Sequence, residues 1–380
     1  MKRSALLLVA ALLSGCFGGS AIDAPAALED FEPAARVKEL WSANTGKGPG
    51  EDYLRLQHVL ARDAVYTTDS RGRVRALKRD SGDEIWQVKL NLPVTSGVGL
   101  GDDLVLVATR KGDVVALDRT TGKEQWRAQV SNEVLAPPAA EAGVTVVQSV
   151  DGKLTGIASG TGKRLWIIDR SEPALSLRGT ASPTILSDIV VTGFASGRIL
   201  AASLRDGRVL WEIPVAQPQG RSEVERLIDV DVPVLHVGPI LLAAAYQGKI
   251  VALNLENGRL LWSSEISTYS AMATDGSNVY VSDTLGRVHA LNLKTGAVVW
   301  KQEKLHGRHP GAPVVVADAV AVGDYKGYLH WLARTDGHFL ARERMARSAI
   351  LAAPLADDGM LYAVAQNGNL AVLRLDPRKP

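Results

Sequence analysis

The sequence predicts an all-β protein, an eight-bladed β-propeller built from four-stranded antiparallel blades. Three observations lead to this prediction. A sixteen-residue pattern recurs along the chain, about four short apolar runs fall in every forty residues, and seven tryptophans stand at equivalent places in the repeat. No helical periodicity of comparable length interrupts the series. With 46% hydrophobic residues among 380, the chain has enough apolar side chains for a large core.

The repeat is clearest in RGRVRALKRDSGDEIW at 71–86 and KGDVVALDRTTGKEQW at 111–126. Each copy opens on a glycine that we expect in a tight hairpin turn, because positive φ costs little without a Cβ. A short strand, a second glycine-containing turn and a strand ending in Trp follow. The first glycines are separated by 40, 40, 45, 51, 38, 41 and 41 residues: Gly72, Gly112, Gly152, Gly197, Gly248, Gly286, Gly327 and Gly368. Eight such turns predict eight blades.

The eighth copy stops before its last strand, at NGNLAVLRLDPRKP. The segment VKELW at 37–41 looks like the missing strand, so we expect the N-terminal strand to complete the C-terminal blade and close the ring. The seventh copy ends in Ala341, and Trp331 is offset from the repeat position. The tryptophans at the repeat position are predicted to be structural anchors between blades: Trp41, Trp86, Trp126, Trp166, Trp211, Trp262 and Trp300.

The first residues indicate a targeting segment. Lys2 and Arg3 precede an apolar run that is too short to span a bilayer, so residues 1–15 are expected to be a signal peptide. The segment LSGC at 13–16 resembles the bacterial lipobox, which implies that Cys16 carries diacylglycerol and an N-acyl chain. The alternative is an ordinary signal peptide with an incidental cysteine.

Phe17 follows the cysteine, where the enterobacterial sorting pattern has Asp for retention in the inner membrane. This resemblance implies a lipid anchor in the outer membrane, on its periplasmic face. Residues 16–35 are rich in Ala, Gly, Pro and acids and are expected to be the lipidated N-terminus and a flexible tether. The propeller is then predicted over residues 36–380.

Composition excludes several classes of protein. One cysteine excludes an intramolecular disulfide and a Cys-based zinc or iron–sulfur site. The net charge of +2, from 43 basic and 41 acidic residues, argues against a nucleic-acid binder. The GTGK at 160–163 lacks the rest of a phosphate loop and is the hairpin turn of the repeat.

The repeat pattern A-L-x-x-x-T-G-x-x-x-W resembles two families with opposite activities. One is the quinoprotein dehydrogenases, which use pyrroloquinoline quinone; the other is the BamB family, propeller lipoproteins of the outer-membrane β-barrel assembly machinery. Many quinoprotein enzymes have an adjacent cysteine pair, which a chain with one cysteine lacks. Two local segments favour the BamB family: LSLRG at 175–179, and ERLIDVD at 225–231 with Glu225 where that family has Asp.

The resemblance implies a non-enzymatic scaffold that binds the POTRA domains of BamA and assists assembly of outer-membrane β-barrel proteins. Unfolded outer-membrane proteins are further partners, and no catalytic residue, cofactor or metal is expected. Matching positions assign partner binding to Leu175, Leu177, Arg178, Asp229 and Asp231. A dehydrogenase dependent on pyrroloquinoline quinone, or a quinone-binding propeller, is the alternative.

Spacing supports the same location independently. The step from the blade-ending Trp to the Pro that opens the next strand is 17 from Trp166 and 22 from Trp211, but only 12 from Trp126. Two neighbouring connections on one face of the disc are therefore long, and long loops on a rigid scaffold often bind partners. An internal ion pair from Arg178 to Asp229 or Asp231 is the alternative, and it is compatible with binding.

Overall fold

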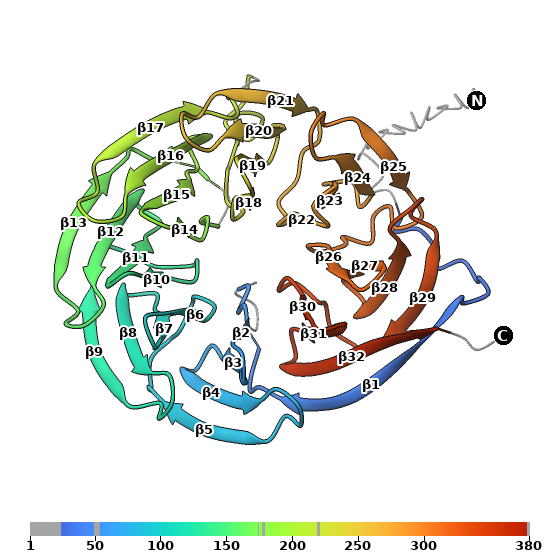
Figure 1. Cartoon of the computed structure of the whole chain (residues 1–380), viewed down its shortest axis with the longest axis horizontal. Coiled ribbons are helices and arrows are strands. Elements are labelled where there is room, and N and C mark those ends of the chain that lie inside the picture. Colours follow the sequence, from blue (N-terminus) through green and yellow to red (C-terminus); the bar gives the residue numbers. More distant parts are fainter. Residues whose placement is uncertain (1–23, 49–53, 174, 177–178, 219–220, 378–380) are drawn as a thin grey trace, which may run out of the picture.

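The computed structural model describes residues 24–48, 54–173, 175–176, 179–218 and 221–377. The described residues form strands and turns without an α-helix, and they contain no helix that could cross a membrane. The strands make eight four-stranded antiparallel sheets arranged as blades around a ring (Figure 1). The predicted eight-bladed propeller is confirmed.

Each blade is a meander whose first strand is innermost (Figure 1). Blades one to four comprise β2 (Val59–Leu60), β3 (Ala64–Thr68), β4 (Arg73–Lys78) and β5 (Glu84–Lys89); β6 (Gly99–Gly101), β7 (Leu104–Ala108), β8 (Asp113–Asp118) and β9 (Glu124–Gln129); β10 (Ala139–Glu141), β11 (Val144–Gln148), β12 (Lys153–Ala158) and β13 (Arg164–Asp169); and β14 (Thr184–Leu186), β15 (Ile189–Gly193), β16 (Arg198–Ser203) and β17 (Val209–Pro214). Blades five to seven comprise β18 (Leu235–Val237), β19 (Ile240–Ala244), β20 (Ile250–Asn254) and β21 (Leu260–Ser264); β22 (Ala273–Thr274), β23 (Asn278–Ser282), β24 (Val288–Asn292) and β25 (Val298–Gln302); and β26 (Val314–Val316), β27 (Ala319–Gly323), β28 (Tyr328–Ala333) and β29 (Phe339–Arg344).

Blade eight joins the two ends of the chain. It consists of β30 (Leu355–Asp357), β31 (Met360–Val364), β32 (Asn369–Pro377) and β1 (Ala35–Asn44), in that order. The outer strand β1 pairs antiparallel with β32, with Trp41 opposite Val372. The N-terminal strand thus closes the ring, as the sequence predicts, and it covers the edge of β32 that would otherwise be unpaired.

The core lies between neighbouring blades. One cluster joins Val146 and Leu154 of blade three to Val190 and Leu200 of blade four. Because a blade is covered on both faces, its second strand is buried throughout and mostly apolar, and all five residues of β11 are buried. This packing explains why the sequence reads as short continuous apolar runs rather than as strict alternation.

The first glycine of seven copies takes positive φ, between 76° and 87°, as expected for the hairpin between second and third strands. The fifth copy differs, because Gln247 takes the left-handed conformation there instead of Gly248. In blades one, six and seven an aspartate three residues before the glycine accepts backbone hydrogen bonds across the turn: Asp69, Asp283 and Asp324.

Each repeat-position tryptophan connects its blade to the next one. The indole Nε1 donates to a backbone carbonyl at the turn between the third and fourth strands of the next blade, at 2.5–3.1 Å in all seven cases. The ring packs on the glycine of that turn; a Cβ on Gly162 would lie 3.0 Å from the ring of Trp126. The Thr-Gly of one copy is therefore matched to the Trp of the preceding copy.

Blade seven exchanges the two members of one cross-strand pair. In blades one to six a small residue of the third strand faces Trp of the fourth, as in Ala116 opposite Trp126. In blade seven Trp331 of β28 faces Ala341 of β29. The offset of Trp331 seen in the sequence thus arises because Trp and the small residue have exchanged strands within the same cross-strand pair. The Trp331 side chain is fully buried.

The swap has a physical reason in the way the ring closes. The third and fourth strands of blade eight are the two ends of the chain, so no hairpin turn joins them. A tryptophan on β29 would therefore meet no turn carbonyl in the next blade. At its own position on β28, Nε1 of Trp331 has no hydrogen-bond partner among the described residues.

Residues 24–34, which we call the strap, lie along blade seven. The backbone N–H of Ala34 donates to the carbonyl of Leu340 at 2.9 Å, and the ring of Phe31 stacks on Phe339 with centroids 5.4 Å apart. The sequence predicts a flexible tether over 16–35; the described part of that segment is packed on a blade. Cys16 and the signal peptide predicted over 1–15 lie outside the described residues.

Candidate protein-interaction face

Three long connections open on one face of the disc. In a four-stranded antiparallel blade the first strand begins and the fourth ends on the same face, so all blade-to-blade connections share it. The connection from blade three to four runs over 170–183, that from four to five over 215–234, and that from β1 to β2 over 45–58. The first two are the pair predicted from spacing. The third connection was not predicted from the sequence; its end lies near the centre of the ring (Figure 1).

The end of the 215–234 connection is threaded between blades four and five. Asp229 forms a β-bridge with Tyr246, whose backbone N–H donates to the carbonyl of Asp229 at 2.8 Å. Of the apolar members of the alternating IDVDV run, Ile228 and Val230 are buried in the cluster between blades four and five, and Val232 in the cluster between blades five and six. Alternation places the two aspartates on the other side of the segment.

Both aspartates that were predicted to bind a partner are buried. Asp229 is 1% exposed and Asp231 is 7% exposed. Burial raises the pKa of the Asp231 carboxyl, and the charge of Arg55, on the 45–58 connection, opposes that shift. Their carboxylates are therefore poorly placed to meet a partner directly, and their role in binding stays a prediction.

Asp231 also contacts the connection that carries the other predicted residues. A Cβ on Gly179 would lie 2.4 Å from Oδ2 of Asp231, so only glycine permits this approach. The structure thus brings the LSLRG and ERLIDVD segments together at one point. Leu175, four residues before Gly179 in the same connection, is 44% exposed. Leu177 and Arg178 lie outside the described residues.

The middle of the 215–234 connection is an exposed, self-bonded turn. The carboxylate of Glu225 accepts backbone N–H bonds from Arg221 at 2.6 Å and Ser222 at 3.2 Å, and the Ser222 hydroxyl accepts the N–H of Glu225 at 3.2 Å. These bonds lower the pKa of Glu225. Val224, at its tip, is 63% exposed. The turn holds an apolar tip next to charged side chains, a mixture common at protein interfaces.

Glu172 is a residue of this face that no sequence pattern indicated. It precedes Leu175 in the first connection, and its Cγ lies against Gly152, where a Cβ would approach to 2.8 Å. Burial raises its pKa to about 7, against hydrogen bonds from the backbone N–H groups of Ala195 and Ser196 that favour the charged form. Its Oε2 is buried without a hydrogen-bond partner in the described part of the chain.

The raised pKa of Glu172 predicts a pH-dependent stability. A carboxyl whose folded-state pKa lies above its unfolded value of 4.5 contributes stability below that value and loses it as pH rises toward 7. We expect the Glu172→Gln variant to gain on the order of 2 kcal/mol over the wild type between pH 4.5 and 7. Urea unfolding at several pH values measures this difference.

Other titrating groups contribute equally to the unfolding free energies of wild type and Glu172→Gln, so their effect disappears when one is subtracted from the other. One such group is His58, whose pKa is lowered to about 4 by burial. Parallel pH profiles for wild type and Glu172→Gln would show that Glu172 is not held protonated in the fold.

Comparison with known proteins fits this architecture. The family described as "Outer membrane protein assembly factor BamB" matches residues 70–302 and 286–379. A protein of that name from Pseudomonas aeruginosa PAO1 is 45% identical over 370 residues, 97% of each chain, and one from Escherichia coli K12 is 33% identical over 380 residues, 96% of each chain.

Solved structures agree. The crystal structure of BamB from Moraxella catarrhalis superposes with a TM-score of 0.82 at 27% identity, covering 89% of this chain and 100% of that one. The quinohemoprotein alcohol dehydrogenase from Comamonas testosteroni, with a TM-score of 0.70 at 15% identity over 90% of this chain and 77% of that one, shares the fold alone. The sequence match, which extends over nearly the whole length of the relatives, decides between the two resemblances: the chain belongs to the BamB family of outer membrane protein assembly factors.

Proposed function

We propose that this protein is a non-enzymatic scaffold lipoprotein, anchored through Cys16 on the periplasmic face of the outer membrane. It binds the POTRA domains of BamA and assists assembly of outer-membrane β-barrel proteins. Membership of an assembly-factor family supports the general role. The observation that carries the binding site is the meeting of two long connections at Gly179 and Asp231, the first of which also carries the exposed Leu175.

In this proposal the five predicted residues have two different tasks. Leu175, Leu177 and Arg178 contact the partner, because apolar anchors beside a guanidinium suit a protein interface. Asp229 and Asp231 act as positioning residues, since both are buried and Asp231 lies against Gly179. A charge reversal at Asp229 would therefore test folding rather than binding, and a surface change is the sharper experiment.

Replacing Leu175 with aspartate should weaken binding to BamA. Losing a central apolar anchor at an interface costs about 2 kcal/mol or more, which is a roughly thirtyfold weaker complex. Co-purification with BamA, followed by a titration of its isolated POTRA domains, measures the effect.

Leu165→Asp is the matched control. Leu165 is 50% exposed but lies on the outer strand β13, away from the connections. It should leave binding unchanged, and circular dichroism should show both variants folded. Wild-type affinity in the Leu175 variant would place the interface elsewhere.

The outer strands favour a second way of assisting assembly. They end their sheets and carry exposed apolar side chains on five blades: Ile85, Leu165, Ile167, Leu210, Leu260, Leu261, Val298 and Val299. An open strand edge can pair with an extended chain, with main-chain hydrogen bonds providing the affinity. Unfolded outer-membrane proteins are chains of this kind, so the same scaffold could hold a nascent strand while bound to BamA.

A further inference from the structure

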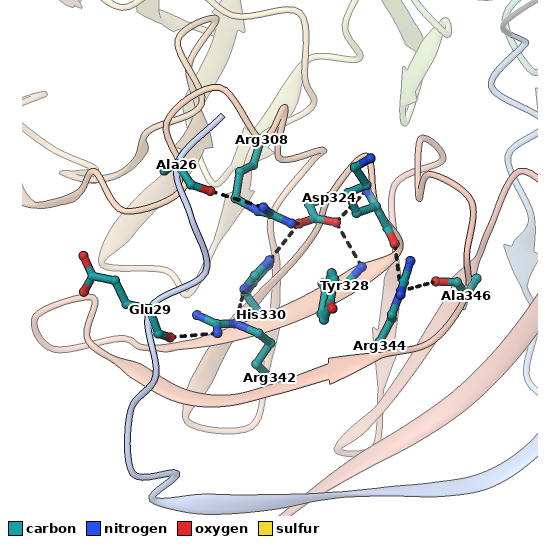
Figure 2. Close-up of polar contacts among 10 residues, drawn as sticks. Ala26, Glu29, Arg308, Asp324, Tyr328, His330, Arg342, Arg344 and Ala346 are labelled. Atoms are coloured by element: carbon teal, nitrogen blue, oxygen red, sulfur yellow. Dashed lines mark hydrogen bonds and ion pairs between the residues drawn. The ribbon is translucent and has the colours of Figure 1, made fainter. Parts of the chain in front are cut away.

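The strap leaves the propeller at the connection between blades six and seven. The backbone N–H of Ala26 donates to the carbonyl of His306 at 2.9 Å, and Arg308 donates to the carbonyl of Ala26 at 3.3 Å. Farther along, Arg342 donates to the carbonyl of Glu29 at 2.9 Å, and Lys304 pairs with the Glu29 carboxylate at 2.6 Å. Together these contacts hold the strap across the blade; Figure 2 shows those made by Arg308 and Arg342.

The remaining chain is short compared with the disc. Seven residues lie between Cys16 and Ala24, and the eight steps from one Cα to the other span at most about 28 Å when extended. A folded domain of this length has a radius of gyration of about 20 Å, and hence a width of roughly 50 Å. A lipid on Cys16 therefore places blades six and seven nearest to the membrane.

The base of this region is a buried ion pair. Asp324 is fully buried and accepts hydrogen bonds from Arg308 at 2.6 and 2.9 Å, while Nε2 of His330 lies 3.2 Å from the same carboxylate oxygen (Figure 2). The guanidinium of Arg308 also lies over the rings of Tyr325 and Tyr328. The charge of Asp324 is thus engaged by groups beneath the surface.

Three exposed basic residues of this region form what we call the cationic rim: Lys326, Arg344 and Arg347. The Lys326 ammonium lies 5.1 Å from the ring centre of Tyr325, and the Arg344 guanidinium 5.2 Å from that of Tyr328. Arg347 is close to Lys326 along the surface, because its neighbours Ala346 and Ser348 pack their carbonyls on the Gly327 turn.

The rim has no internal counter-charge in the described part of the chain. No carboxylate there lies within 4.0 Å of the charged nitrogens of Lys326, Arg344 or Arg347. Nearby lysines are paired, Lys301 with Glu303 among them. Glu343 adjoins Arg344 on β29, but successive strand residues point to opposite faces. The positive charge of the rim is therefore directed outward.

We propose that the cationic rim docks on the anionic phosphate headgroups of the membrane that holds the lipid anchor. This inference rests on the lipidation of Cys16 in the proposed function. Lysine and arginine near an anionic bilayer surface each add to attraction, and tyrosine rings suit the headgroup region. Anchor and rim together fix the orientation of the disc, with blade seven toward the bilayer and the connections of blades three to five farther away.

The test uses the lipidated full chain in vesicles that contain a lipid with a headgroup-attached quencher. A fluorophore is placed at His309→Cys, beside Tyr325, or at Asn132→Cys; both positions are exposed and both lie on blade connections. In vesicles with phosphatidylglycerol we expect quenching at 309 to exceed that at 132 about fivefold. High salt should reduce the ratio, because it screens exposed charge.

Charge variants separate the rim from general electrostatics. Lys326→Glu/Arg344→Glu/Arg347→Glu should bring the quenching ratio close to one, and the corresponding glutamine variant should give an intermediate ratio. Arg71→Glu/Lys89→Glu/Lys111→Glu, on blades one and two, makes the same charge change at exposed positions and should leave the ratio unchanged. Lys111 precedes the turn glycine of its blade as Lys326 does.

The outcomes distinguish the two proposals. Mass spectrometry that finds no acyl group on Cys16 overturns the anchor and this inference together. A lipidated protein with equal quenching at both positions, or with a ratio that the rim variant leaves intact, overturns the inference alone. A rim variant that keeps its ratio but loses co-purification with BamA shows that the rim binds a protein instead.

Discussion

Replacing Trp126 with alanine should lower the free energy of unfolding by about 3–5 kcal/mol, the range for deleting a large buried aromatic side chain. Its indole is 8% exposed, packs on Gly162 and donates to the carbonyl of Ser159. The truncation leaves a cavity between blades two and three and removes the donor to that carbonyl. Equilibrium unfolding in urea, followed by far-ultraviolet circular dichroism, measures the change.

Phenylalanine variants isolate the hydrogen bond within this effect. Trp126→Phe keeps an aromatic ring but loses the donor, whereas Trp331→Phe loses a donor that has no partner among the described residues. We expect Trp126→Phe to cost about 1 kcal/mol more than Trp331→Phe. Equal costs would mean that the indole bond between blades adds nothing beyond packing.

Replacing Asp324 with alanine should cost about 3–5 kcal/mol of folding stability, because it leaves the charge of Arg308 buried and unpaired. The Arg308 side chain is 7% exposed and that of Asp324 is fully buried. The backbone N–H groups of Lys326 and Tyr328 lose their acceptor as well. The same urea unfolding experiment measures the loss.

Two comparisons test the reason for that loss. Glu303→Ala breaks the exposed pair with Lys301 and should cost less than about 1 kcal/mol. The double change Asp324→Leu/Arg308→Met removes both buried charges and should recover much of the stability lost in Asp324→Ala. If the double variant is no more stable than the single one, the buried charge is not the main source of the cost.

Most of the fold could be predicted from the sequence because every blade of a propeller uses the same local packing. Each copy needs a glycine where the preceding blade's tryptophan packs, and a small residue opposite its own tryptophan, as at Gly162 and Ala116. These requirements are local and recur together in the first six copies, so they are visible as a pattern. The exchange of Trp331 and Ala341 was not predictable in the same way, because it depends on the absence of a hairpin in the next blade.

The site is less visible in sequence because its contacts are long-range. Loop length located the two neighbouring connections, but not the burial of Asp229 and Asp231, which depends on threading between two blades. The 45–58 connection, with Arg55, escaped notice because it follows the strand that is displaced to the start of the chain. The strap resembles a linker in composition, and only its contacts with side chains such as Phe339 make it part of the fold.

The pairing of β1 with β32 also affects how the molecule is made. Residues joined in blade eight, such as Trp41 and Val372, are separated by almost the whole chain, so their contact carries a high entropic cost of loop closure. The closing strand is synthesised first and its partner last. The seven other blades depend only on neighbouring sequence and can form earlier, which leaves the joining of the two ends as the expected final step of folding. Until that step an exposed strand edge remains, and shielding from other unfolded chains matters most then.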